Sequence, residues 1–231
     1  MHEWYAAPME GLTGWRWRQV QHEMFGRAAL YVTPFVSPNG NFSFQRKELE
    51  ELDPERNRGI PVVPQILTNR AEYFVWAAKE CRSRGWAQVD LNLGCPSGTV
   101  TGKKKGAGLL RQPELLRQLL DGIFDALPDM KISVKTRIGW ERAEEWPALL
   151  ALLETYPICR LTVHPRVRTQ FYKGTADREV FRWTAEHTAL PLCYNGDVTT
   201  VRDLWEMGEA FPDDAVMVGR GLVADPSLLR Q

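Results

Sequence analysis

The chain has 231 residues, of which 44% are hydrophobic, enough to bury one substantial core. Its 29 basic and 29 acidic residues give a formal net charge of zero, which argues against a protein that coats nucleic acid over its whole surface. No apolar run approaches the roughly 18 residues of a membrane span, and no signal-peptide pattern is present. We therefore expect a soluble, cytoplasmic protein with no membrane partner.

The cysteines are widely scattered, without a CxxC pair and without the spacing of a metal site. The four are Cys81, Cys95, Cys159 and Cys193. Free thiols of this kind are typical of an intracellular protein. We expect no bound metal.

Short apolar runs rich in β-branched residues alternate with segments of helical periodicity along the chain. The runs predict strands at residues 4–7, 29–33, 62–66, 89–93, 132–136, 161–163, 190–194 and 216–218. Between them, residues 71–84 and 114–127 place apolar side chains on one helical face. Strands that alternate with such helices pair in parallel through right-handed crossovers.

Eight such units predict an α/β fold of the closed (β/α)₈ type, a TIM barrel, as one domain over residues 1–231. A doubly wound open sheet is the alternative, but its GxGxxG turn is missing after the first strand, where Pro8-Met9-Glu10-Gly11 stands. The chain stops at Gln231, soon after the eighth strand. We therefore expect the last helix to be truncated.

The most informative motif is Asn92-Leu93-Gly94-Cys95-Pro96, which places a cysteine where the strand at 89–93 ends. Loops at that end of each strand form the catalytic face of a barrel, so Cys95 is a candidate acid or nucleophile. A buried structural cysteine is the alternative. The glycine-rich loop that follows contains Lys103, Lys104 and Lys105, and it is expected to be a mobile, basic lid.

Polar and glycine residues also follow the other predicted strands, which would bring them into one ring. They are Pro8, Met9, Glu10, Gln65, Lys135, Arg137, His164, Arg166, Arg168, Asn195, Gly196, Asp197, Gly219 and Arg220. Consecutive glycine turns at 195–197 and 219–221 predict a phosphate site, although each could be an ordinary turn. Lys135 lies in an apolar strand, so its ammonium group should face the barrel axis and need an anionic partner, although an outward-pointing, solvated lysine is the alternative.

These motifs, together with Ala7-Pro8-Met9-Glu10-Gly11, resemble the flavin-dependent tRNA-dihydrouridine synthases in order and over nearly the whole chain. The resemblance implies an FMN-containing barrel that reduces the C5=C6 bond of uridines in tRNA, with NADPH as electron donor. It implies that Cys95 donates the proton and that the FMN is bound by Pro8, Met9, Glu10, Gln65, Lys135, His164, Asn195, Gly196, Asp197, Gly219 and Arg220.

The chemistry of Cys95 agrees with that role. Hydride addition at C6 of uracil leaves negative charge at C5 and O4, so a proton must arrive from the opposite face. A thiol with a pKa of about 8.5 is mostly protonated at neutral pH and can donate it.

The residues expected to contact the tRNA are Asn92, Lys103, Lys104, Lys105, Arg137, Arg166 and Arg168. The uridine must leave its stack to enter a barrel mouth.

Two departures from the family pattern matter. Pro165 replaces the small residue that usually follows the sixth-strand histidine. The family's C-terminal helical tRNA-binding domain is absent from residues 1–231, so we expect this chain alone, as a monomer, to modify tRNA weakly. Two other functions stay open: an FMN barrel that reduces a free pyrimidine or a small enone, and a non-catalytic barrel that binds RNA or a partner.

Overall fold

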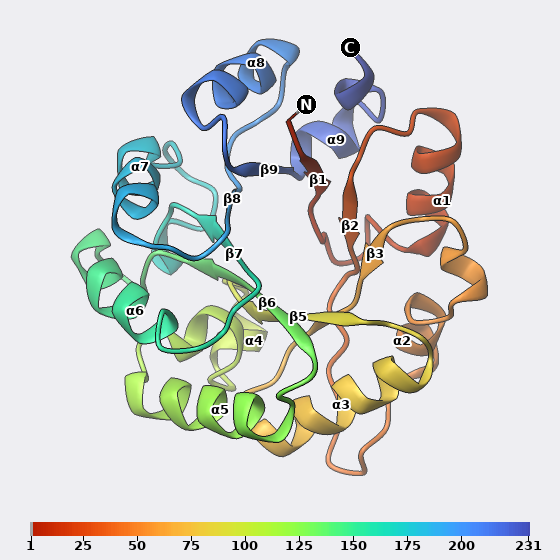
Figure 1. Cartoon of the computed structure of the whole chain (residues 1–231), viewed down its shortest axis with the longest axis vertical. Helices are drawn as coiled ribbons and strands as arrows, with labels where there is room; N and C mark the ends of the chain where they lie inside the picture. The colour runs from red at the N-terminus through yellow and green to blue at the C-terminus, as the bar shows by residue number, and fades with distance from the viewer. Residues whose placement is uncertain (1) are drawn as a thin grey trace.

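The computed structural model describes residues 2–231, which form a (β/α)₈ barrel (Figure 1). All strand pairs are parallel, and the strands form a central ring with most of the helices around it. The strands are β1 (Trp4–Ala6), β2 (Leu30–Val32), β3 (Val62–Val63), β4 (Gln65–Ile66), β5 (Gln88–Leu93), β6 (Lys131–Arg137), β7 (Arg160–His164), β8 (Leu192–Tyr194) and β9 (Ala215–Val218). The predicted fold class is confirmed.

The barrel closes at its third strand, which Pro64 divides into β3 and β4. β3 pairs with β2 and β4 pairs with β5, so the two ends of the sheet are neighbours in the chain. Proline has no backbone N–H group, so it interrupts the hydrogen-bond ladder at this position. The nine short strands therefore correspond to the eight predicted ones.

Helices follow the strands in the expected alternation. They are α1 (Trp15–Met24), α2 (Arg46–Glu51), α3 (Ala71–Ser83), α4 (Gly98–Thr101), α5 (Pro113–Ala126), α6 (Trp146–Leu153), α7 (Arg178–His187), α8 (Val201–Ala210) and α9 (Arg220–Ala224). The predicted helices at 71–84 and 114–127 match α3 and α5 to within one residue. After β9 the chain forms the five-residue helix α9 and a 3₁₀ turn, Leu228–Arg230.

The main core lies between the sheet and the helices. On β5, Val89, Leu91 and Leu93 are fully buried in this cluster, which also contains the apolar face of α5. Because side chains alternate along a strand, the residues between them face the barrel interior. Asp90 and Asn92 are therefore brought inside, with Asn92 nearer the catalytic face.

The loop at 98–108 differs from the expected mobile lid. It forms α4 and a 3₁₀ segment, Gly106–Leu109, whose residues are all buried. Gly106 has a φ of +54°, and a Cβ there would lie 2.9 Å from the Cys95 carbonyl oxygen, so the loop packs directly against the Cys95 turn. The glycines therefore allow close packing in this loop, and the prediction of a flexible lid was wrong.

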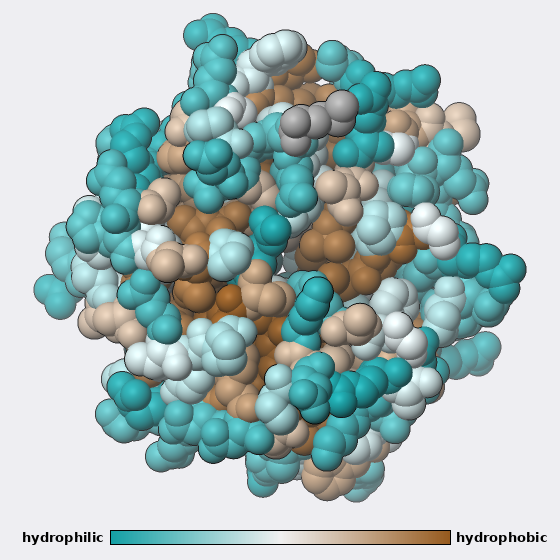
Figure 2. Space-filling model, viewed as in Figure 1, coloured by the Kyte–Doolittle hydropathy of each residue, from teal (hydrophilic) through white to brown (hydrophobic). Residues whose placement is uncertain are grey.

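The face shown in Figure 2 has hydrophilic residues gathered around its outer rim and hydrophobic residues visible between the elements nearer the middle. Among the helices of residues 2–231, none is long and apolar enough to cross a bilayer.

Candidate active site

A cavity of about 300 Å³ opens where the carboxyl ends of the strands meet. This volume lies at the lower end of the range of small-molecule sites. Its lining includes every residue expected to bind a cofactor, together with three of the other predicted site residues. Those residues are Pro8, Met9, Glu10, Gln65, Asn92, Cys95, Lys135, Arg137, His164, Asn195, Gly196, Asp197, Gly219 and Arg220.

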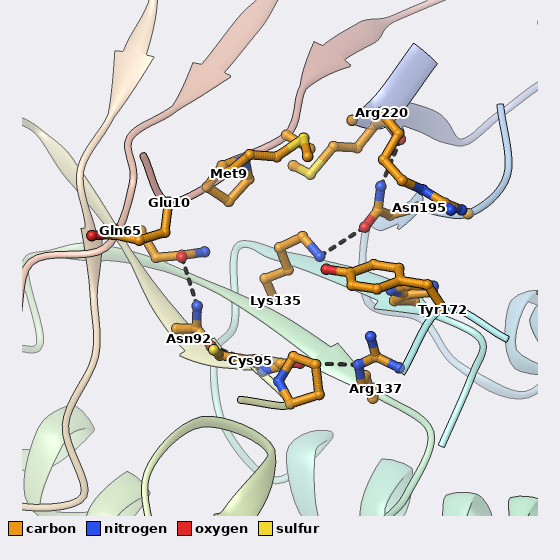
Figure 3. Close-up of a pocket in the computed structure, with 18 of the residues that line it drawn as sticks. Met9, Glu10, Gln65, Asn92, Cys95, Lys135, Arg137, Tyr172, Asn195 and Arg220 are labelled. Atoms are coloured by element: carbon orange, nitrogen blue, oxygen red, sulfur yellow. Dashed lines mark hydrogen bonds between the residues drawn. The ribbon is translucent and has the colours of Figure 1, made fainter. Parts of the chain in front are cut away.

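Figure 3 shows how these side chains are arranged. Met9, Asn195 and Arg220 lie on one side of the close-up, and Asn92, Cys95 and Arg137 lie on the opposite side, with Lys135 between them. The Cys95 thiol therefore shares one cavity with the glycine turn at Gly219. A thiol facing the opposite direction, into the core, would have excluded a role in chemistry.

The Cys95 turn is held by Asn92. The Asn92 Oδ1 atom accepts hydrogen bonds from the backbone N–H groups of Gly94 (3.1 Å) and Cys95 (2.9 Å). Burial raises the pKa of the Cys95 thiol, although the Ser97 N–H group and the nearby cations act in the other direction. The thiol is consequently protonated at neutral pH, as a proton donor must be.

Lys135 carries the cation nearest the middle of the cavity. Its Nζ donates to Asn195 Oδ1 at 2.7 Å, and Asn195 Nδ2 in turn donates to the Met217 carbonyl at 2.8 Å. Burial, and then the Arg137 guanidinium, lower the pKa of Lys135 to about 8. Lys135 is therefore mostly charged at neutral pH, and it has no carboxylate of residues 2–231 within ion-pair distance. An anionic edge of a ligand would satisfy it.

His164 is neutral in this environment. Burial, followed by the cations of Arg137, Lys135, Arg166 and Arg220, lowers the pKa of His164 well below its ordinary range. The Arg166 Nη1 atom lies 3.1 Å from His164 Nε2. Because a guanidinium can only donate, Nε2 accepts and the ring proton is on Nδ1.

Asp197 joins two arginines at the rim. Its carboxylate contacts Arg166 Nη2 at 2.6 Å and Arg220 Nη2 at 2.8 Å. Burial raises the pKa of Asp197, but the hydrogen bonds from Arg166 and from the Ala176 N–H group outweigh this and lower it. Arg166 is only 1% exposed, so the structure places it beneath the surface, where it holds Asp197 and His164. This position does not fit the direct tRNA contact that the sequence predicted.

Arg137 supports the Cys95 turn from the opposite side. Its Nε donates to the Gly94 carbonyl at 3.0 Å and its Nη1 to the Val167 carbonyl at 3.1 Å. Burial lowers the pKa of Arg137 to about 10, so it stays charged at neutral pH. The cation lies 5.5 Å from the centre of the Tyr172 ring.

Tyr172 is a site residue that the sequence analysis missed. It lines the cavity, is half exposed, and lies beneath both the Arg137 and the Arg220 guanidinium groups, the latter at 5.1 Å from its ring centre. It belongs to a loop without periodicity. The only available signal was its nearness in the chain to Arg166 and Arg168.

The remaining predicted tRNA contacts lie outside the cavity lining. Lys103 and Lys104 are exposed, whereas Lys105 is half buried and donates to Ser37 Oγ at 3.0 Å. Arg168 donates to the Pro96 carbonyl at 3.1 Å, beside the Cys95 turn. Its guanidinium also lies 4.6 Å from the centre of the Trp140 ring.

The two predicted phosphate turns differ in why they need glycine. A Cβ on Gly196 would lie 2.5 Å from the Ala176 Cβ, so packing alone excludes a side chain there. A Cβ on Gly219 would meet the Ala7 Cβ at 3.3 Å and Met9 Sδ at 3.6 Å, next to the cavity. Gly219 and Arg220 therefore form a wall that can receive a phosphate-bearing group, and together with the Lys135 cation this donor set fits FMN.

The comparisons with known proteins agree with this geometry. The family model described as "Dihydrouridine synthase (Dus)" matches residues 5–231. The chain belongs to the dihydrouridine synthase family. Two similar relatives are a "Probable tRNA-dihydrouridine synthase" of Rhizobium leguminosarum bv. phaseoli and "tRNA-dihydrouridine synthase B" of Proteus vulgaris. They are 33% and 30% identical to the chain over 95% and 98% of its length, and the chain covers 68% and 69% of theirs.

The resemblance and the enzyme class expected from the sequence are thereby confirmed. Solved structures agree with the fold. A histamine dehydrogenase from a Rhizobium species has a TM-score of 0.71 at 13% identity, covering 99% of this chain and 45% of that one. A morphinone reductase mutant has a TM-score of 0.62 at 12% identity, covering 99% of this chain and 85% of that one. At these identities the likeness concerns the barrel alone.

Proposed function

We propose that this protein reduces the C5=C6 bond of particular uridines in tRNA to 5,6-dihydrouridine, with FMN as cofactor and NADPH as electron donor. The observation that carries the proposal is the single cavity that contains a protonated thiol, Cys95, and the cations of Lys135 and Arg220. Membership of the dihydrouridine synthase family supports it.

The residues present fit FMN. Lys135 and Gln65 would hold the pyrimidine edge of its ring, and Pro8, Met9, Glu10 and His164 would line the ring. The phosphate would be bound by Asn195, Gly196, Gly219 and Arg220, whereas the ionised Asp197 carboxylate does not fit a phosphate contact and would instead position Arg220. When bound, FMN supplies the hydride for C6 of the uracil after reduction by NADPH.

Cys95 would donate the proton to C5. Its raised pKa keeps the thiol protonated, and the turn that carries it is fixed by Asn92 on one side and Arg137 on the other. The cations of Lys135 and Arg137 would stabilise the negative charge that develops on the uracil as the bond is reduced.

The loops beside the cavity support an RNA substrate. Residues 91–113 and 165–176 contain seven lysines and arginines and no acidic residue. The seven are Lys103, Lys104, Lys105, Arg111, Arg166, Arg168 and Lys173. Six of them would attract phosphates around an extruded uridine, while the buried Arg166 would position Asp197.

Cys95→Ala tests the proposal. Flavin binding and its reduction by NADPH should be unchanged, whereas dihydrouridine formation should fall by roughly 10²–10⁴-fold, the usual contribution of a general acid. Cys159→Ala is the matched control, because Cys159 is another partly buried thiol and does not line the cavity. A fully active Cys95→Ala variant would falsify the role of the thiol.

The two alternative functions give different results in the same assays. Activity on free uracil or on dihydroorotate in the absence of RNA would favour an enzyme that acts on small molecules. A colourless protein without flavin absorbance would favour a non-catalytic barrel. Size-exclusion chromatography tests the predicted monomer.

A further inference from the structure

A buried carboxylate lies inside the barrel behind the Cys95 turn. Asp90 on β5 is only 3% exposed. Its Oδ2 accepts from Gln65 Nε2 at 2.7 Å, and its Oδ1 accepts from Ser133 Oγ at 2.7 Å. Asp90 does not line the cavity, so it does not contact a ligand there directly.

The hydrogen bond to Gln65 is the first of a series that ends at Cys95. Gln65 Oε1 accepts from Asn92 Nδ2 at 2.7 Å (Figure 3). Asn92 Oδ1 then accepts from the backbone N–H groups of Gly94 and Cys95. Three side chains thus connect the barrel interior with the turn that carries the thiol.

The direction of this series is fixed at both of its ends. An ionised carboxylate can only accept, and a backbone N–H group can only donate. Gln65 must therefore turn its NH₂ group toward Asp90, and Asn92 must turn its NH₂ group toward Gln65. Each end alone sets the orientation of both amides, and the two ends agree, so every hydrogen bond of the series is satisfied.

We propose that Asp90 is a positioning residue that accepts the free hydrogen-bond donor of Gln65 and, through Gln65 and Asn92, holds the Cys95 turn in place. Its meaning for catalysis rests on the proposed function, but the positioning itself does not. Replacement by leucine, which can neither donate nor accept, leaves Gln65 Nε2 without its acceptor and releases this end of the series. Replacement by asparagine does not, because its Oδ1 atom can still accept from Gln65.

The charge state of Asp90 depends on its surroundings. Burial raises the pKa of Asp90 to about 6, although the hydrogen bonds from Gln65 and Ser133 and the Lys135 ammonium lower it. Cys159 is the other titratable group that faces it. At pH 7 to 8 Asp90 is an acceptor at both oxygens, so measurements in that range test the ionised form.

Asp90→Leu is the first test, read by hydrogen–deuterium exchange at the Gly94 and Cys95 amides and by alkylation of Cys95 with iodoacetamide. Loss of one hydrogen bond corresponds to about 1 kcal/mol, so both rates should rise by roughly 2–10-fold. In the tRNA assay kcat should fall while KM for tRNA stays unchanged. Ser133→Ala is the matched control, because it removes the other bond to Asp90 and leaves the series intact.

Asp90→Asn is the conservative rescue. The Oδ1 atom introduced at position 90 can accept from Gln65 Nε2, and the NH₂ group can donate to Ser133 Oγ, so the direction of the series is kept. Exchange at Gly94 and Cys95 should stay within about twofold of the wild-type rate. Gln65→Leu, which breaks the series one step nearer to Cys95, provides the test if Asp90→Leu does not fold.

Exchange and alkylation rates in Asp90→Leu that match those of Ser133→Ala would overturn the proposal. Rates in Asp90→Asn as fast as those in Asp90→Leu would overturn it as well. Neither measurement needs RNA or a cofactor. Absence of dihydrouridine formation by the wild type would therefore refute the proposed function. Faster exchange in Asp90→Leu would still support the positioning role.

Discussion

The interior of the barrel has an apolar half and a polar half. The apolar half comes from β1, β2, β8 and β9 and their ends, and consists of Tyr5, Ala7, Val32, Cys193, Ala215 and Met217. The polar half comes from β4, β5 and β6, and includes Gln65, Asp90, Asn92, Ser133 and Lys135. The inward-facing positions of the strands therefore carry apolar side chains in one half of the barrel and polar side chains in the other.

The difference shows which part of the molecule is built for stability. In the apolar half, burial of hydrocarbon stabilises the folded state. In the polar half, burial disfavours the charged forms, raising the pKa of Asp90 to about 6 and lowering that of Lys135 to about 8. A site that costs stability in this way is expected where the side chains are kept for binding or chemistry.

Lys135→Met should separate cofactor affinity from folding stability most clearly. Loss of a hydrogen bond from a charged group corresponds to about 1.5–3 kcal/mol, so affinity for FMN should fall roughly 10–150-fold. The free energy of unfolding without cofactor should stay equal or rise, because a desolvated ammonium is removed. Equilibrium dialysis with FMN and urea denaturation measure the two effects.

The pH dependence of the wild type adds a check on Lys135. Its ammonium loses its proton as pH rises through about 8, so affinity for FMN should fall above that pH, and Lys135→Met should lack this fall. Lys131→Met is a suitable control, since Lys131 lies at the exposed start of the same strand. An unchanged affinity in Lys135→Met would mean that the polar half does not serve the cofactor.

Val32→Ala tests the apolar half. Val32 is buried there and does not line the cavity, so removal of its methyl groups should lower the free energy of unfolding by about 2 kcal/mol. Affinity for FMN should be unchanged. Urea denaturation and FMN titration of the same samples give both numbers, and a loss of affinity without loss of stability would contradict the division into two halves.

Arg168→Ala should have the smallest effect, outside the barrel. The Trp140 ring centre lies 4.1 Å from the guanidinium carbon of Arg111 and 4.6 Å from that of Arg168. Neither arginine has a carboxylate of residues 2–231 within ion-pair distance. Affinity for tRNA should fall about fivefold, with a weaker dependence on salt. Arg202→Ala, on the exposed side of α8, should change neither the affinity for tRNA nor its salt dependence. A loss of affinity as large as that in Arg168→Ala would indicate nonspecific electrostatic attraction.

Alternation along the strands made much of this arrangement predictable. The apolar residues Ile132 and Val134 identify the outward face of β6, so Lys135 was correctly placed inside. The same pattern in β5 places Asp90 inside, but the strand was treated as uniformly apolar and the carboxylate was overlooked. Cys95 was found because a strand end has a fixed place in a barrel.

The loops could not be predicted in this way. Tyr172 and Trp140 reach the arginines through turns that bring β6 and β7 loops together, as in the hydrogen bond from the Thr169 N–H group to the Trp140 carbonyl at 3.0 Å. Such contacts depend on tertiary packing and leave no periodic signal. The flexibility predicted from the glycine content of residues 98–108 was also wrong, because Gly106 and Gly108 allow tight packing there.

The large apolar cluster between the sheet and the surrounding helices has a consequence for how this protein can evolve. Because that outer layer supplies most of the buried hydrocarbon, substitutions in the lumen on β4, β5 and β6 remove little of it. New specificities can therefore arise by mutation of the lumen while the scaffold persists.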